Sequence, residues 1–171
     1  LWASVRHNQL CEFWLPAWKP DCAYGLKQSL AADALAFHTC MDISIHAQEN
    51  FLTSGISYDM RKCFDTIPMI LVLQIFNFRG ADSQVTRALN GFYKQHHKHF
   101  KLEGSFDTPF RPSNGIIQGC PLSMLLLTSM ISAWCEFCMV QLPQSQPRSY
   151  ADDLSICNFA TTAPELVDRT Q

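Results

Sequence analysis

Charged side chains are scarce in this chain: they make up 16% of its 171 residues, and the net charge is only −2. A total so close to zero does not by itself indicate a nucleic-acid-binding protein, although an acidic cluster can offset a basic surface elsewhere. Apolar residues make up 47% of the chain, which excludes a disordered tail. We therefore expect one domain with a substantial buried core.

Long hydrophobic runs are also missing. The longest, residues 69–78 and 122–134, fall short of the roughly 20 residues that a membrane span needs. No charged segment followed by an apolar core opens the sequence, so no signal peptide and no membrane partner are expected. The expectation is an intracellular protein, nuclear or cytoplasmic and not secreted.

Cysteines are plentiful, but a disulfide or zinc pattern is lacking. Eight cysteines are scattered through apolar surroundings, as buried thiols are in a reducing compartment. Cys135 and Cys138 form a C-x-x-C pair inside a predicted helix, with no second pair at zinc spacing. The pattern therefore disfavours a zinc site.

Two adjacent carboxylates, Asp152 and Asp153, follow Tyr150 and Ala151. The surrounding residues predict a short hairpin whose turn lies at Ala151-Asp152. Because neighbouring strand side chains point to opposite faces, we expect Asp152 to bind a metal directly and Asp153 to bind it less directly or to orient it. Alone, an Asp-Asp pair in a turn is usually only turn chemistry, because Asp favours such positions.

A second acidic position ends another predicted strand, residues 53–60, in which Ile56 and Tyr58 share one face and Asp59 lies on the other. Three carboxylates brought together would raise one another's pKa unless cations neutralise them. Oxygen ligands suit magnesium, which prefers a few carboxylates plus substrate phosphates. Two such ions about 3.5–4 Å apart could stabilise the attacking and leaving oxygens of a displacement at phosphorus.

Three short segments carry a resemblance to a known family. Residues 58–65, YDMRKCFD, resemble motif A of reverse transcriptases; residues 114–123, NGIIQGCPLS, resemble their motif B; and residues 150–153, YADD, resemble their motif C. The order of the motifs and the intervals between them also fit. The Phe64-Asp65 pair and the QGCPLS run are most similar to non-LTR retroelements and their group II intron relatives.

The resemblance implies an α+β polymerase palm, in which a small antiparallel sheet carries the catalytic carboxylates and helices pack on one face. Residues 1–52 would form partial fingers and a leading helix, and residues 53–171 the palm core, with the thumb absent. The sequence departs from the family at Cys63, where alanine is usual. It also offers no convincing upstream arginine or lysine motif to clamp a triphosphate.

By the same resemblance, Asp59, Asp152 and Asp153 are the catalytic residues. Asp59 and Asp152 would bind two Mg²⁺ ions, or Mn²⁺, with help from the backbone carbonyl of Met60 and with Asp153 in support. Phe64 would lie under the incoming sugar and exclude a 2′-hydroxyl. The other implied substrate-binding residues are Arg61 and Lys62 at the triphosphate, Gln118, Gly119 and Pro121 around the nucleotide and template, and Tyr150 near the primer end.

The implied reaction is RNA-directed DNA synthesis, in which the 3′-oxygen of a DNA primer on an RNA template attacks the α-phosphate of a dNTP. The alternative is a catalytically inactive reverse-transcriptase-like remnant, or a scaffold that binds nucleic acid or protein. An RNA-dependent RNA polymerase is disfavoured because Phe64 occupies the sugar gate. Residues 94–101 are basic, which is typical either of contact with a phosphate backbone or of a solvated helix end.

Periodicity and turn residues predict the remaining elements. Helices are expected over residues 28–49, with Phe37, Met41 and Ile45 on one apolar face, and over residues 69–76, with Thr66 as cap. Further helices are expected to begin at Asp82 or Ser83, at Pro121 and near Thr162. A hairpin is expected around residues 104–107, and an irregular, aromatic-rich layer over residues 1–28.

Overall fold

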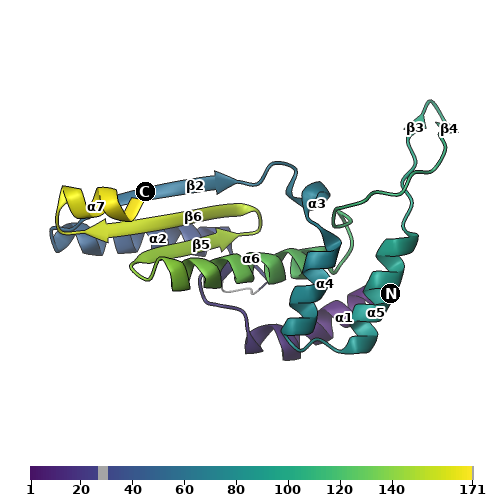
Figure 1. Cartoon of the computed structure of the whole chain (residues 1–171), viewed down its shortest axis with the longest axis horizontal. Helices are drawn as coiled ribbons and strands as arrows, with labels where there is room; N and C mark the ends of the chain where they lie inside the picture. Colours follow the sequence, from purple (N-terminus) through teal and green to yellow (C-terminus); the bar gives the residue numbers. More distant parts are fainter. Residues whose placement is uncertain (27–30, 171) are drawn as a thin grey trace.

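The computed structural model describes residues 1–26 and 31–170. Within these residues the centre of the fold is a four-stranded sheet with the order β1-β5-β6-β2 (Figure 1). The strands are β1 (Ala23–Tyr24), β2 (Leu52–Asp59), β5 (Ser145–Tyr150) and β6 (Asp153–Ala160). The β2–β6 and β5–β6 pairs are antiparallel, as expected, whereas β1 pairs with β5 in parallel. The predicted α+β class with a small sheet is therefore found, but the sheet is not wholly antiparallel.

Strands β5 and β6 form the predicted hairpin, with its turn at Ala151-Asp152. Ala151 has a positive φ of 52°, an uncommon conformation for a residue with a side chain. The whole of β2 pairs along β6, from Leu52 opposite Ala160 to Asp59 opposite Asp153. The predicted strand over residues 53–60 is thus confirmed to within one residue at either end.

Helices cover both faces of the sheet, so the expectation of helices on one face is wrong. Cys135 on α6 (Ser123–Gln141) lies 3.7 Å from the hydroxyl of Ser149 on β5. The neighbouring side chain, Arg148, points to the opposite face and there contacts Thr39 and Asp42 of α2 (Ala32–Gln48). Figure 1 accordingly shows α6 in front of the strands and α2 behind them. The physical reason is that β5 buries a guanidinium, which needs the polar partners that α2 supplies.

Helix α2 lies at the predicted place, although residues 28–30 of its predicted start lie outside the described residues. Its apolar stripe, however, faces outward: Phe37, Met41 and Ile45 are 61%, 43% and 44% exposed. Its polar side contacts the sheet, where the His46 ring stacks on Phe159 at a centroid distance of 3.8 Å. The predicted apolar face is therefore present on this helix, but it does not meet the sheet.

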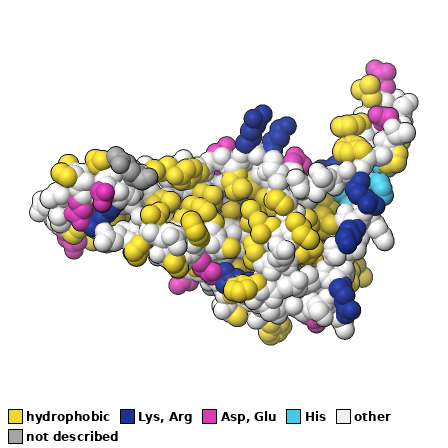
Figure 2. Space-filling view, in the orientation of Figure 1, with side chains coloured by type: hydrophobic (Ala, Val, Ile, Leu, Met, Phe, Trp, Pro, Cys, Tyr) yellow, Lys and Arg dark blue, Asp and Glu magenta, His cyan; other side chains and the backbone are white. Residues whose placement is uncertain are grey.

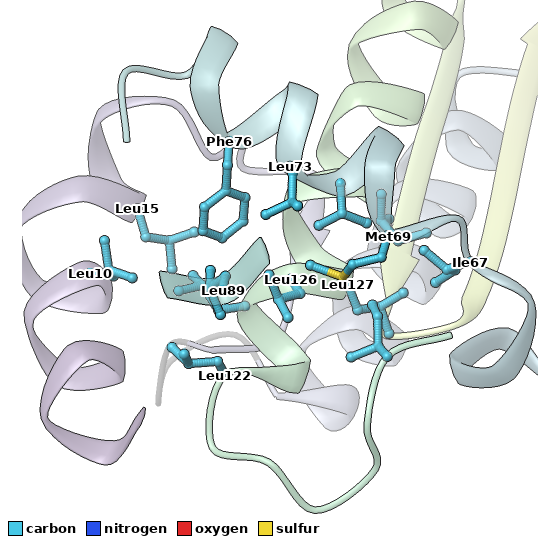
Figure 3. Close-up of a cluster of buried hydrophobic side chains, with 14 of the residues drawn as sticks. Leu10, Leu15, Ile67, Met69, Leu73, Phe76, Leu89, Leu122, Leu126 and Leu127 are labelled. Atoms are coloured by element: carbon cyan, nitrogen blue, oxygen red, sulfur yellow. The ribbon is translucent and has the colours of Figure 1, made fainter. Parts of the chain in front are cut away.

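The main hydrophobic core lies beside the sheet, among α4 (Met69–Phe78), α5 (Ser83–Gln95), the first half of α6 and the N-terminal segment. Figure 3 shows side chains from these elements converging, with Leu15 and Phe76 on one side of the cluster and Met69 and Ile67 on the other. Such burial is the dominant stabilising term, at about 1.5–3 kcal/mol for each large side chain.

The N-terminal segment is helical to residue 17, where an irregular layer was expected. It consists of α1 (Trp2–Gln9), the π-helical turn η1 (Leu10–Trp14) and the 3₁₀ turn η2 (Leu15–Ala17). Trp14 anchors it, because its indole N–H donates to the carbonyl of Arg79 at 2.9 Å and its ring lies 4.6 Å from that of Phe76. Changes of helix type within 16 residues leave no steady 3.6-residue period to detect.

Other helix boundaries are partly as predicted. Asp82 caps α5, since its carboxylate accepts the N–H of Gln84 at 2.7 Å, and α7 (Ala163–Thr170) begins within one residue of Thr162. Two starts were wrong. Thr66 ends a separate short helix, α3 (Cys63–Thr66), and Pro68 takes the N-cap of α4. Helix α6 begins at Ser123, two residues after Pro121.

A second, two-stranded sheet made of β3 (Lys101–Leu102) and β4 (Ser105–Phe106) stands away from the body of the molecule (Figure 1). Its turn lies at Glu103-Gly104, tighter than the predicted turn over residues 104–107. Below it, Lys98 and Phe110 pair as an isolated bridge. The hairpin predicted in this region is therefore present with a shifted turn.

Among the described residues, α6 is long and apolar enough to cross a membrane when judged by length and composition alone. However, 56% of its most apolar window is buried within the molecule. Since the central helix of a folded core passes the same test, this is weak evidence for a span.

Candidate active site at one end of the sheet

Three aspartates lie together at one end of the sheet: the adjacent pair Asp152 and Asp153, and Asp59, which is distant from them in the sequence. Asp59 is the last residue of β2 and pairs with Asp153, the first residue of β6. Directly opposed residues in an antiparallel pair have Cβ atoms about 4.5–5.5 Å apart and share a face. Asp152 lies next to them in the β5–β6 turn. Asp59 and Asp153 are exposed and Asp152 is half-buried, so all three carboxylates are open to a ligand in solution.

The thiol of Cys63 lies close enough to two of these aspartates for their charges to act on it. Burial raises the pKa of Cys63 to about 11, and the negative charges of Asp152 and Asp59 raise it further. Cys63 is 2% exposed and begins α3, just after the motif A-like strand. The charges of Asp59 and Asp152 therefore act on one buried atom, although the two residues are more than 90 positions apart in the sequence.

The backbone between Asp59 and α3 forms a tight turn. Lys62 adopts the left-handed conformation with φ 50°, and the N–H of Cys63 donates to the carbonyl of Met60 at 3.1 Å. One lone pair of the Met60 oxygen is thus used, which leaves the second for the metal contact that was predicted. Arg61 and Lys62 are exposed beside this turn.

The motif B-like loop packs directly on the backbone of α3. The N–H of Gly115 donates to the carbonyl of Ile67 at 2.9 Å, and the N–H of Ile116 donates to the carbonyl of Phe64 at 2.5 Å. Gly115 has φ +107°, and a Cβ atom added there would lie 3.0 Å from the Phe64 carbonyl oxygen. Only glycine permits both this conformation and this approach.

The remaining predicted site residues differ in how far they are exposed to solvent. Tyr150 is half-buried at the end of β5, paired with Asp153. Phe64 is half-buried against the core beneath the motif B-like loop. From that loop, Gln118, Gly119 and Pro121 are exposed.

Sequence reasoning missed two contacts that support this region. The hydroxyl of Tyr93, on α5, accepts the N–H of Ile117 at 3.3 Å, and burial raises the pKa of Tyr93 to about 12. Lys98 forms an ion pair with Asp65 at 3.3 Å. Neither contact has a signal in the sequence, because the partners are 24 and 33 positions apart; the nearest hint is that a buried tyrosine usually finds a partner for its hydroxyl.

The carboxylates at the end of the sheet suit a divalent cation that takes its other ligands from substrate and water. Among the described residues, no group of three or more His, Cys, Asp and Glu side chains is arranged to hold a metal ion. Magnesium, however, is commonly bound by one or two carboxylates together with substrate phosphates and water. Exposed carboxylates from two strands fit that mode, and do not fit a closed protein cage.

Comparison with known proteins supports the fold. No protein-family model matches the chain, and no curated protein matches its sequence. Among solved structures, apo telomerase from Candida tropicalis, truncated from its C-terminal domain, matches with a TM-score of 0.70 and 13% identity over 97% of this chain. Telomerase from Candida tropicalis in complex with a TWJ fragment of telomeric RNA matches with a TM-score of 0.71 and 12% identity over 96% of this chain.

Telomerase is a polymerase related to reverse transcriptases, so the chain has a reverse-transcriptase-like, palm-like fold. The identity is low, and the likeness therefore concerns the fold alone. The chain spans 35% and 30% of the two telomerase chains.

Proposed function

We propose that this chain is the core of an RNA-directed DNA polymerase that adds dNTPs to the 3′-hydroxyl of a DNA primer on an RNA template. The observation that carries the proposal is the pairing of Asp59 with Asp153 beside Asp152 in the turn. It joins the motif A-like and motif C-like segments at one sheet end. The motif B-like loop packs on α3, which directly follows Asp59 in the chain.

In this proposal the three aspartates supply oxygen ligands, with Asp59 and Asp152 as the main ones and Asp153 and the Met60 carbonyl in support. Two Mg²⁺ ions, or Mn²⁺, would stabilise the attacking and leaving oxygens of the phosphoryl transfer. The chain's own residues mainly position the reactants, which is where much of the rate of such reactions arises.

The substrate contacts belong to the residues around the carboxylates. Arg61 and Lys62 are exposed cations beside the turn and would meet the triphosphate. Phe64 would exclude a 2′-hydroxyl by the bulk of its ring. The loop residues Gln118, Gly119 and Pro121 would shape the nucleotide and template pocket, and Tyr150 would lie near the primer end.

We propose the type of genetic element from the residue types in the motif-like segments. The Phe64-Asp65 pair and the QGCPLS run favour a retroelement of the non-LTR or group II intron type over other polymerases with this fold. Residues 53–171 would then be the palm core, residues 1–52 partial fingers and a leading helix, and the protein would act inside the cell.

A second function has one observation in its favour. Because no set of three metal-binding side chains is arranged for a metal among the described residues, the chain could instead be an inactive module that binds RNA. One of the telomerase structures with this fold is a complex with telomeric RNA. This alternative predicts nucleic-acid binding without incorporation.

Primer extension separates the two. The chain is incubated with a labelled DNA primer annealed to an RNA template, dNTPs and Mg²⁺, and compared with Asp152→Asn and with Asp168→Asn, an exposed aspartate on α7. We expect extension by the unchanged chain and by Asp168→Asn, and a loss of about 10³-fold or more in Asp152→Asn, since ligand loss removes several kcal/mol of transition-state stabilisation. Extension by none of the three would favour the inactive module, and equal extension by all three would show that Asp152 is not a catalytic residue.

A further inference from the structure

The β3–β4 hairpin and its base, residues 94–110, have features that the proposed active site does not need. We call this segment the aromatic hairpin. Three of its phenylalanines, Phe100, Phe106 and Phe110, are 67%, 68% and 40% exposed. In Figure 1 the β3–β4 strands stand clear of the sheet and the helices, and the exposed fractions show that the rings of Phe100 and Phe106 are mostly uncovered. Exposed aromatic side chains gathered in one place mark an interaction site.

The rings are already ordered. Phe100 and Phe110 stack with centroids 5.2 Å apart and planes inclined by 20°. The Lys101 ammonium lies 5.5 Å from the centre of the Phe106 ring, and His99 meets that ring edge-on at 6.2 Å. These contacts hold the aromatic side chains in place and leave much of each ring surface free to stack on a planar partner.

Positive charge is concentrated at the base of the aromatic hairpin. Residues 94–101 contain three lysines and three histidines and no acidic residue, whereas the two acidic residues of the segment, Glu103 and Asp107, follow in the hairpin itself. Figure 2 shows Lys, Arg and His side chains gathered at the base of the projecting hairpin, with apolar and acidic side chains along it. Lys98 pairs with Asp65, but both side chains are substantially exposed, at 40% and 52%, so the pair is weak and can be replaced by a phosphate contact.

A groove lies between the base of the aromatic hairpin and the motif B-like loop. It has a volume of about 430 Å³ and is lined on one side by residues 96–100 and Phe110. On the other side it is lined by Asp65, Ile117 and Gln118, which belong to the motif A-like and motif B-like segments. A ligand along the groove would therefore reach the predicted template pocket.

We infer that the aromatic hairpin binds single-stranded RNA, with bases stacked on Phe100 and Phe106 and phosphates held by Lys94, Lys98 and Lys101. Aromatic rings interleaved with cations along a groove are the features by which proteins hold unpaired strands. A protein that docked on the apolar rings would leave the lysines and histidines at the base of the hairpin unexplained. The inference rests on the proposed function for the role of the strand as template, while binding itself requires no catalysis.

The test is fluorescence anisotropy with a labelled 16-nucleotide single-stranded RNA of mixed sequence, without dNTPs. Phe100→Leu and Phe106→Leu keep an apolar side chain but remove the aromatic face. Each should weaken binding about tenfold, because stacking on an aromatic ring is a large part of such affinity. Phe137→Leu, at a 63% exposed position on α6, is the matched control and should bind as the unchanged chain.

Two further measurements sharpen the result. Lys101→Gln should lower the slope of log affinity against log salt by about 0.7, as expected for one lost phosphate contact on a single strand. The same RNA annealed to its complement should bind at least about tenfold more weakly, because its bases are no longer free to stack.

Full affinity in both leucine variants would overturn the inference, because the RNA would then be held elsewhere than on these rings. Equal affinity for the single strand and the duplex would also overturn it. Because no incorporation is measured, strand binding by a chain inactive in primer extension would refute the polymerase proposal and leave this one intact.

Discussion

Gly115 meets two separate constraints at the junction of the motif A-like and motif B-like segments. Its φ of +107° disfavours any other residue, and a Cβ atom would lie within 3.0–3.2 Å of the backbone of Phe64 and Asp65. Gly119 has only the first constraint, with φ +83° and nothing within 4 Å, and Gly91 on α5 has neither.

A glycine-to-alanine series therefore separates conformation from packing. We expect Gly115→Ala to lower the free energy of unfolding by about 2–3 kcal/mol, and Gly119→Ala by about 1 kcal/mol, since strained backbone positions cost about 1–3 kcal/mol each. Gly91→Ala should stabilise α5 by about 0.5–1 kcal/mol. Urea unfolding followed by circular dichroism measures all three. A loss for Gly115→Ala no larger than that for Gly119→Ala would contradict the close backbone approach.

Cys63 reports on the charges of the candidate site. Its pKa is about 11 instead of its ordinary 9.0, because of burial first and then Asp152 and Asp59. The folded chain therefore keeps the thiol proton over a pH range in which the unfolded chain loses it. The stability associated with this group is present below about pH 9 and falls as the pH rises toward 11.

Removing one of these charges should lower the pKa of the Cys63 thiol. We expect Asp152→Asn to shift the pH profile of Cys63 alkylation by iodoacetamide to lower pH, with most of the shift from burial retained. Asp153→Asn, at the adjacent position, is the control and should leave the profile nearly unchanged. Alkylation of the Cys63 peptide is followed by mass spectrometry. An unshifted profile in Asp152→Asn would show that this carboxylate does not lie near α3.

Single residues differ in how far the sequence could predict them. Asp59, Asp152 and Asp153 were predictable as neighbours, because each lies at a strand end or turn and the three motif-like segments follow one another in the order of the family that they resemble. Tyr93 and Lys98 were not, because their partners in the loop and α3 are set by the tertiary fold.

At the scale of elements, the contact between α2 and β5 depends on one buried ion pair. The Arg148 side chain is 9% exposed and pairs with Asp42, which is 32% exposed. Arg148 also donates to Thr39 at 2.8 Å and to Gln146 at 3.1 Å. This network ties α2 to the strand that leads into Tyr150.

Loss of the carboxylate would leave a buried cation. We expect Asp42→Ala to lower the free energy of unfolding by about 3 kcal/mol, because breaking a buried pair leaves an uncompensated charge. The double variant Asp42→Ala, Arg148→Met should recover part of that loss. Asp33→Ala, at an exposed position on the same helix, should change stability by less than about 1 kcal/mol. Chemical denaturation tests this, and equal effects of Asp42→Ala and Asp33→Ala would exclude the buried pair.

Elements with a clear local signal were predictable. The β5–β6 turn, the β2 strand and the Asp82 cap of α5 all follow from residue type and spacing. Helix α2 was placed correctly, but its apolar stripe of Phe37, Met41 and Ile45 faces outward. Periodicity identifies an amphipathic helix but not which face meets the sheet, and here polar contacts with Arg148 decide it.

For the whole molecule, the likeness to telomerase and the three motif-like segments lead to one architecture by independent routes. At 13% and 12% identity, the structural match does not come from overall sequence similarity. The motifs predicted a palm-like sheet, but not the parallel strand β1 or the helix on the second face. Those features depend on long-range packing, which a pattern of local residues does not encode.

In the proposed function, Asp59 and Asp152 form one divalent-metal site. Titration of the isotopically labelled chain with Mn²⁺, followed by NMR, tests it most directly, since a paramagnetic ion broadens the signals of nearby amides even when binding is weak. Broadening should appear first at residues 58–60 and 150–153, should spare α7, and should be lost in Asp152→Asn but not in Asp168→Asn. Broadening centred elsewhere, or unchanged in Asp152→Asn, would contradict the account.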